Sequence, residues 1–240
     1  LLVLVYAVGM GLSMAAAAMV ARRIGEKKPE DASRATLQAL YLTLAISVPI
    51  ALVGVFYAPE LMALMGATEQ VIEVGATYCA IIFGGNVIIL LLFLLNAIFR
   101  GAGDAVMAMR VLWLANLINI VLDPALIFGW GPFPELGVTG AAVATTIGRG
   151  IGVAFQLYLL LRGNGRVQLL VDRLKLDWGI IRRMMHVAWP ATIQYGVATA
   201  SWMVLFRIIS LFGTEALAGY TIAIRAVSYT HLTLPTNTVV

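Results

Sequence analysis

Residues 105–128 form an apolar stretch that contains an acidic residue, AVMAMRVLWLANLINIVLDPALIF. The stretch is long enough to cross a bilayer as a helix, because a hydrocarbon core of about 30 Å requires roughly 20 residues. Its charged residues are Arg110, near the beginning, and Asp123, near the end. We therefore predict a transmembrane helix that holds a carboxylate within the membrane.

The rest of the chain repeats this apolar pattern. Further segments of spanning length cover residues 1–21, 35–57, 71–99, 138–161 and 180–212, and another begins near Glu215. Of the 240 residues, 61% are hydrophobic and 12% are charged, whereas soluble domains have about 25% charged residues. The composition predicts an all-α fold, a polytopic transmembrane helix bundle. Because the chain opens inside an apolar run, we expect it to be an incomplete part of a larger protein.

Basic residues fall in alternate loops between these segments. The loops after the first, third and fifth segments are basic, and those after the second, fourth and sixth contain no Lys or Arg. By the positive-inside rule, we expect a multi-pass protein of the cell (plasma or inner) membrane whose basic loops are cytoplasmic. The net charge of +4 is then an orientation signal, and we expect lipid rather than nucleic acid as the partner.

Motifs of enzymes and metal sites are scarce. The single cysteine, Cys79, cannot form an intrachain disulfide, and His186 and His231 do not have the spacing of metal ligands. The sequence contains no Walker A loop and no G-x-S-x-G motif. We therefore expect a protein that is not an enzyme, holds no cofactor and, apart from a bound coupling ion, has no metal site.

Asp123 is the strongest candidate for a functional residue. Asn119 and Asn116 precede it by four and seven residues, a spacing that places all three on one face of a helix. A carboxylate within the membrane is costly and usually faces a cavity or an ion pathway. The alternative is an aspartate that ends the helix at the interface, where Pro124 would break it.

This polar stripe offers a site for a proton or a cation. The carboxylate can exchange a proton between the two sides of the membrane, and carboxylate with amide oxygens suits a hard cation such as Na⁺. A threonine hydroxyl on the next segment would complete the ligand set, and the candidates are Thr139, Thr145 and Thr146. Both H⁺ and Na⁺ stay open as the coupling ion.

Other polar side chains fall within the predicted spans. Arg149 lies in the middle of its segment and requires a partner or an aqueous cavity. The remaining candidates for a substrate pathway are Gln38, Asn86, Asn96 and Gln194. For each of these four residues, an interhelical hydrogen bond is the alternative to a role in transport.

Short motifs occur in a fixed order between residues 1 and 226. They are Gly11-Leu12-Ser13 with VARRIG at 20–25, RGAGD at 100–104, Asn116-Leu-Ile-Asn119 with Asp123-Pro124, PELGV at 134–138, GAAVAT at 140–145, WPA at 189–191, GTEALA at 213–218 and IAIR at 222–225. In this order and spacing the chain resembles the multidrug and toxic-compound extrusion (MATE) family of cation-coupled exporters.

The resemblance implies a two-lobe transporter of twelve helices, of which this chain would hold helices two to seven and the start of eight. Residues 1–163 would belong to the N-terminal lobe, 164–177 to a cytoplasmic linker and 178–228 to the start of the C-terminal lobe. Residues 229–240 lose apolar character, and we expect a non-native tail there. The resemblance also implies that Asn119 and Asp123, with Thr145 as a further member, match the cation site of the first lobe.

These observations lead to a functional hypothesis with two alternatives. We expect an H⁺- or Na⁺-coupled antiporter that exports organic cations, drugs or related amphiphiles by alternating access and acts as a monomer. The first alternative is a flippase or exporter of lipid-linked or polysaccharide precursors, whose cavity should carry several basic residues. The second is a membrane receptor or scaffold without transport activity, which would leave Asp123 unexplained.

Overall fold

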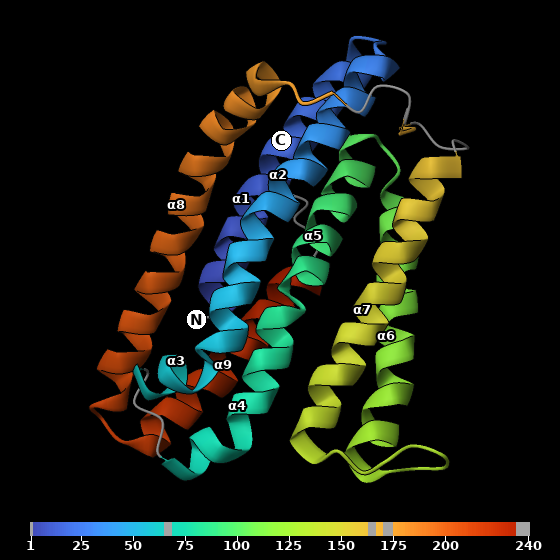
Figure 1. The fold of residues 1–240 in the computed structure, drawn as a ribbon. Helices are drawn as coiled ribbons and strands as arrows, with labels where there is room; N and C mark the ends of the chain where they lie inside the picture. The colour runs from blue at the N-terminus through green and yellow to red at the C-terminus, as the bar shows by residue number, and fades with distance from the viewer. Residues whose placement is uncertain (1, 65–68, 163–166, 170–174, 234–240) are drawn as a thin grey trace. The chain divides into compact units, whose positions relative to one another are not determined.

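The computed structural model describes residues 2–64, 69–162, 167–169 and 175–233, and the regular elements within these ranges are all α-helices (Figure 1). The chain divides into two compact units, Leu1–Ile193 and Gln194–Val240. Each unit is described by itself, with helix α8 contributing to both. The predicted all-α fold class is confirmed.

Most helices of the first unit are long. Figure 1 shows α1, α2 and α5 side by side and α6 beside α7, in agreement with the contacts between these helices. The bounds are α1 Leu2–Gly25, α2 Pro29–Phe56, α3 Ala58–Leu64, α4 Glu69–Gly84, α5 Asn86–Gly101, α6 Ala105–Phe128, α7 Gly137–Arg162, and α8 from Trp178.

Four of the described helices are long and apolar enough to cross a membrane, namely α1, α2, α6 and α7. The pair α4 and α5 supplies a fifth span if the two bent helices are counted as one. Helix α8, Trp178–Ser210, is continuous at the position predicted for the sixth segment but is not among these helices. Its first turns carry Arg182, Arg183 and His186, which makes the beginning of the helix polar.

The predicted single span at 71–99 is wrong in one respect, because it consists of two helices. Helices α4 and α5 meet at Gly85 with a bend of 43°. The buried Asn86 stabilises this break, since its Nδ2 donates to the carbonyl oxygens of Phe83 at 2.6 Å and of Ser47 at 3.3 Å. Ser47 belongs to α2, so a contact between helices holds the bend.

Small side chains let α1 pack closely against its neighbours. Ala15 and Ala16 of α1 are fully buried in the main apolar core, together with Ala39 of α2 and Ile98 of α5. In membranes such packing, rather than the hydrophobic effect, stabilises the contact between helices.

The second unit contains the later part of α8 and helix α9, Thr214–Thr233. Phe206 of α8 and Tyr220 of α9 make an edge-to-face contact with ring centroids 5.6 Å apart. Helix α9 begins where the seventh segment was predicted and continues past Ser228, the last residue before the expected tail. Residues 234–240 of that tail lie outside the described residues, and its non-native origin stays a prediction.

Candidate functional site

Helix α6 carries the polar stripe predicted from the sequence. Asp104 caps its first turn, because the side chain accepts a hydrogen bond from the Met107 amide at 3.1 Å. The helix continues through Pro124 and ends at Phe128, where Gly129 adopts a left-handed conformation. Asp123 therefore lies inside the helix, and the alternative in which Pro124 terminates it at Asp123 is wrong.

A short hydrogen-bonded cluster joins α6 to α7. Asn119 Nδ2 donates to Asp123 Oδ1 at 3.0 Å and to Thr145 Oγ1 at 3.4 Å. All three side chains are half-buried. Of the three threonines proposed from the sequence, Thr145 is the one in this cluster, whereas Thr146 donates to the Ala142 carbonyl of its own helix at 2.8 Å.

The cluster forms because α7 approaches α6 unusually closely. Four small residues at intervals of four, Gly140, Ala144, Gly148 and Gly152, are buried along α7. A Cβ on Gly148 would lie 3.0 Å from the carbonyl oxygen of Ala115 and 3.5 Å from the backbone nitrogen of Asn119. The absence of a side chain at this position thus allows Thr145 to come within reach of Asn119. This repeat of small residues is visible in the sequence and could have predicted the α6–α7 contact.

A cavity of about 170 Å³ lies against this cluster. Its polar lining comes from four of the predicted residues, Asn116, Asn119, Thr145 and Arg149. Asp123 is not part of the wall but is connected to it through Asn119. The cavity has room for a small ion with several waters. The apolar part of the wall consists of Ile89, Leu92, Phe93, Leu112 and Ala115.

The arrangement brings together oxygen atoms of three kinds. Asp123 contributes a carboxylate, Thr145 a hydroxyl, and Asn119 an amide oxygen, since its amide nitrogen is used in the two hydrogen bonds. Oxygen ligands of this kind suit a proton or a hard monovalent cation. Among the described residues, no group of three or more His, Cys, Asp and Glu side chains could hold a metal ion.

The other predicted pathway residues lie outside this cavity. Gln38 is buried in α2, and its side-chain amide makes two hydrogen bonds to the backbone of the chain that precedes α8. Its Nε2 donates to the Lys175 carbonyl at 2.8 Å, and its Oε1 accepts from the Asp177 backbone amide at 3.1 Å. Asn86 holds the α4–α5 break. Gln194 is exposed on α8 in the second unit.

Asn96 also has an interhelical partner, which the sequence did not reveal. Gln156 of α7 donates from Nε2 to Asn96 Oδ1 of α5 at 3.0 Å, and both side chains are buried. Asn86 and Asn96 thus make the interhelical hydrogen bonds that the sequence left open as the alternative to a role in transport. Gln38 is bonded instead to the backbone of the chain that precedes α8.

The fold and the site define a class: a polytopic α-helical membrane protein with a hydrogen-bonded acidic cluster beside a polar cavity between its helices. Residues 1–125 match the model of the MatE family. The chain therefore belongs to the MatE family, as the motifs in its sequence indicated.

Curated and solved relatives are of the same kind. The chain is 28% identical over 228 residues to the probable multidrug resistance protein YoeA of Bacillus subtilis, covering 93% of this chain and 49% of the relative. It is 27% identical over 220 residues to an FAD transporter of Shewanella oneidensis, covering 90% and 48%. A solved MOP superfamily transporter from Pyrococcus furiosus superposes with a TM-score of 0.84 at 27% identity, covering 95% and 50%. The chain thus spans about half the length of the relatives it matches.

Proposed function

We propose that this chain is part of an H⁺- or Na⁺-coupled antiporter that exports organic cations, drugs or related amphiphiles from the cell. The observation that carries the proposal is the Asp123–Asn119–Thr145 cluster beside a polar cavity. Membership of the MatE family and the similarity to a probable multidrug resistance protein support the same function.

The mechanism follows from the position of Asp123 within a membrane-spanning helix. A carboxylate there is costly in its charged form unless a cation neutralises it. Asn119 and Thr145 orient the carboxylate and supply further oxygen atoms to a bound Na⁺, or the carboxylate takes up a proton directly. When the cavity opens to the other side of the membrane, release of the ion leaves Asp123 charged and favours binding of a cationic substrate. Rocking of one lobe against the other would provide this alternating access.

A second substrate class is favoured by Arg149. This residue lines the cavity together with Asn116, Asn119 and Thr145, and its guanidinium is suited to a phosphate or carboxylate. One relative of similar identity is an FAD transporter, whose substrate carries phosphates. An exporter of phosphate-containing compounds, including lipid-linked precursors, is therefore the alternative.

The test is efflux of a fluorescent cationic dye from cells that express the full-length protein, with wild type compared with Asp123→Asn. We expect wild type to export dye and the variant to lose at least about 90% of the rate, because an amide cannot exchange a proton or neutralise a cation. Imposing an H⁺ or a Na⁺ gradient separately in vesicles identifies the coupling ion. Asp31→Asn is the matched control, since Asp31 lies in the first turn of α2 outside the site.

Membrane abundance of each variant must be equal for the comparison to hold. Equal efflux by wild type and Asp123→Asn would contradict the role of Asp123 in coupling. If neither exports dye but wild-type vesicles move a phosphate-containing compound in an Arg149-dependent manner, the alternative substrate class is supported. If no gradient drives transport and Asp123→Asn changes only thermal stability, the membrane receptor or scaffold is supported.

A further inference from the structure

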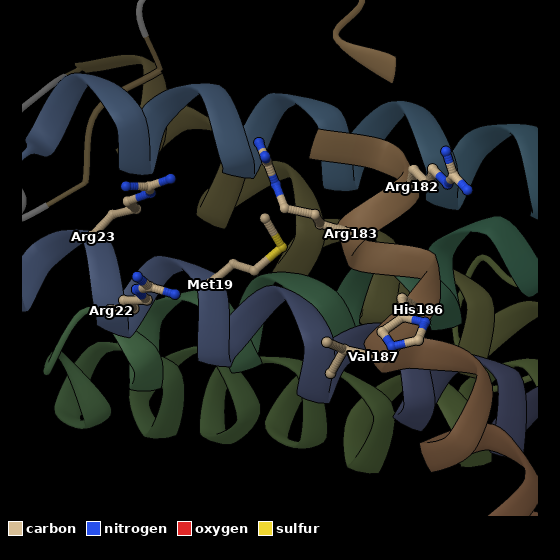
Figure 2. A pocket seen from close by; sticks show the side chains of 7 residues that line it. All are labelled: Met19, Arg22, Arg23, Arg182, Arg183, His186 and Val187. Atoms are coloured by element: carbon tan, nitrogen blue, oxygen red, sulfur yellow. The ribbon is translucent and has the colours of Figure 1, made fainter. Parts of the chain in front are cut away.

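A second cavity, separate from the acidic cluster, lies between α1 and the beginning of α8 within the first unit. Its volume is about 630 Å³, within the roughly 300–1,000 Å³ of known small-molecule pockets. Figure 2 shows the side chains from the two helices that line this space, with Arg183 extending toward α1 and Arg182 to the other side of α8. They are Met19, Arg22 and Arg23 from α1 and Arg182, Arg183, His186 and Val187 from α8.

The lining is strongly basic and only partly neutralised. Glu26 accepts from Arg22 Nε and Arg23 Nη1, each at 2.8 Å, and Asp31 lies 3.9 Å from Arg23. In the described part of the chain, no carboxylate lies within 4 Å of Arg182, Arg183 or His186. The α8 side of the cavity thus presents guanidinium groups whose donors are not used by an acidic residue of the described chain.

The cavity also has an apolar side. Met19 and Val187 line it between the arginines. Behind it, Met184 and Ala188 of α8 are buried in the same apolar core as Leu12 and Ala16 of α1. The two helices approach each other near Ala188, because a Cβ on Gly11 of α1 would lie 2.7 Å from the Ala188 carbonyl oxygen.

Two exposed tryptophans flank the basic residues at the beginning of α8. Trp178 and Trp189 are 72% and 62% exposed, and tryptophan is enriched at the level of lipid headgroups. They are separated by about 16 Å along a helix axis, and Arg182, Arg183 and His186 lie between them. Tryptophans on both sides of the basic side chains favour a position of this segment near lipid headgroups.

We propose that this cavity binds the phosphate of an anionic amphiphile, with guanidinium groups of its lining, Arg183 first among them, on the phosphate and the apolar chain along Met19 and Val187. Guanidinium groups bind phosphate through paired hydrogen bonds, and basic pockets between membrane helices bind anionic headgroups. A phospholipid of the adjacent leaflet and a soluble phosphate-containing amphiphile share this chemistry. This cavity shares no lining residue with the cavity beside the Asp123 cluster.

The test measures the melting temperature of the purified protein in a neutral detergent while phosphatidylglycerol or phosphatidylcholine is added. We expect phosphatidylglycerol alone to raise the melting temperature. Arg182→Gln and Arg183→Gln should each weaken the apparent affinity about tenfold, the effect of losing a charge-assisted hydrogen bond. Arg183→Lys keeps the charge but not the paired donors. We therefore expect its affinity to lie between that of wild type and that of Arg183→Gln.

Arg34→Gln is the matched control, because Arg34 is an exposed arginine of the same basic region that does not line the cavity. An equal loss of affinity in Arg34→Gln would show a general charge effect and overturn the proposal, as would equal stabilisation by the two lipids. Dodecyl phosphate, added in a separate titration, identifies the source of the phosphate. Binding of dodecyl phosphate but not phosphatidylglycerol, dependent on Arg182 and Arg183, supports the site with a soluble ligand.

Discussion

Asn119 links the two helices of the candidate site through its side chain. The side-chain nitrogen Nδ2 donates to Asp123 on the same helix, α6, and to Thr145 on the next helix, α7. The contact with Asp123 was predictable from the sequence, because residues four apart on a helix are neighbours whatever surrounds them. The choice of Thr145 over Thr139 and Thr146 was not predictable from spacing, since it depends on how α7 is positioned against α6.

Thr145→Val tests the contribution of the hydroxyl. The substitution keeps the shape of the side chain and removes the acceptor of the 3.4 Å hydrogen bond from Asn119. Loss of one such bond costs about 1 kcal/mol, so we expect the apparent affinity for the coupling ion to fall roughly fivefold. The measurement is the ion-concentration dependence of dye efflux in vesicles.

Thr146→Val is the control for this experiment. Thr146 is the next residue of α7, but its hydroxyl donates to the Ala142 carbonyl of the same helix. We expect Thr146→Val to leave the ion dependence unchanged. An equal change in both variants would show that Thr145 acts only through the stability of α7.

Glu26 is a residue for which a pH dependence follows from the structure. The hydrogen bonds from Arg22 and then Arg23 hold the pKa of its carboxyl below the usual value of 4.5. Because the folded-state pKa is depressed, the stabilisation is present above pH 4.5 and is lost as the pH falls through the folded-state value. We expect Glu26→Gln to melt slightly below wild type at neutral pH and to match it at a pH well below 4.5. Since Glu26 is at the surface, high salt should also remove the difference, and a difference that persists in acid would contradict this assignment.

At the scale of helices, the contact of α6 with α7 depends on glycine. A methyl group on Gly148 would lie 3.0 Å from the Ala115 carbonyl oxygen, so α7 must move away from α6. Overpacking of this kind costs roughly 1–3 kcal/mol. We expect Gly148→Ala to lower the melting temperature and to reduce transport by separating Thr145 from Asn119.

Gly150→Ala provides the comparison for Gly148→Ala. A methyl group at Gly150 would lie 3.4 Å from Ile88 Cδ1, the end of a flexible side chain, and both substitutions replace glycine with alanine within the same helix. We expect Gly150→Ala to be neutral or slightly stabilising. Equal melting temperatures for the two variants would show that the α6–α7 contact does not require the small residue at 148.

The helices themselves were largely predictable, whereas the break between α4 and α5 was not. An apolar segment of spanning length predicts a helix because the membrane requires internal backbone hydrogen bonds, and α6 agrees with residues 105–128. Gly84 and Gly85 are compatible with either a straight or a bent helix. The bend depends on Asn86 reaching Ser47 of α2, a contact between distant segments that no local pattern contains.

At the scale of the whole molecule, charge and fold give a consistent orientation. Figure 1 shows the α1–α2 and α5–α6 connections at one end of the first unit and the α6–α7 connection at the opposite end. Lys27 and Lys28 lie in the α1–α2 connection, whereas the α6–α7 connection carries Glu135 and no Lys or Arg. We propose that the first end faces the cytoplasm, as the positive-inside rule requires.

Cysteine accessibility in intact cells tests this orientation. In a background from which Cys79 and any cysteine of the rest of the protein have been replaced with alanine, a single cysteine is introduced as Lys28→Cys or Glu135→Cys, both at exposed positions. We expect a membrane-impermeant maleimide to label Glu135→Cys in intact cells and Lys28→Cys only after the membrane is permeabilised. The two sites serve as controls for each other, because each must react after permeabilisation. The reverse pattern would show that the basic loops face outward, and it would place the arginine-lined cavity between α1 and α8 on the outer rather than the cytoplasmic leaflet.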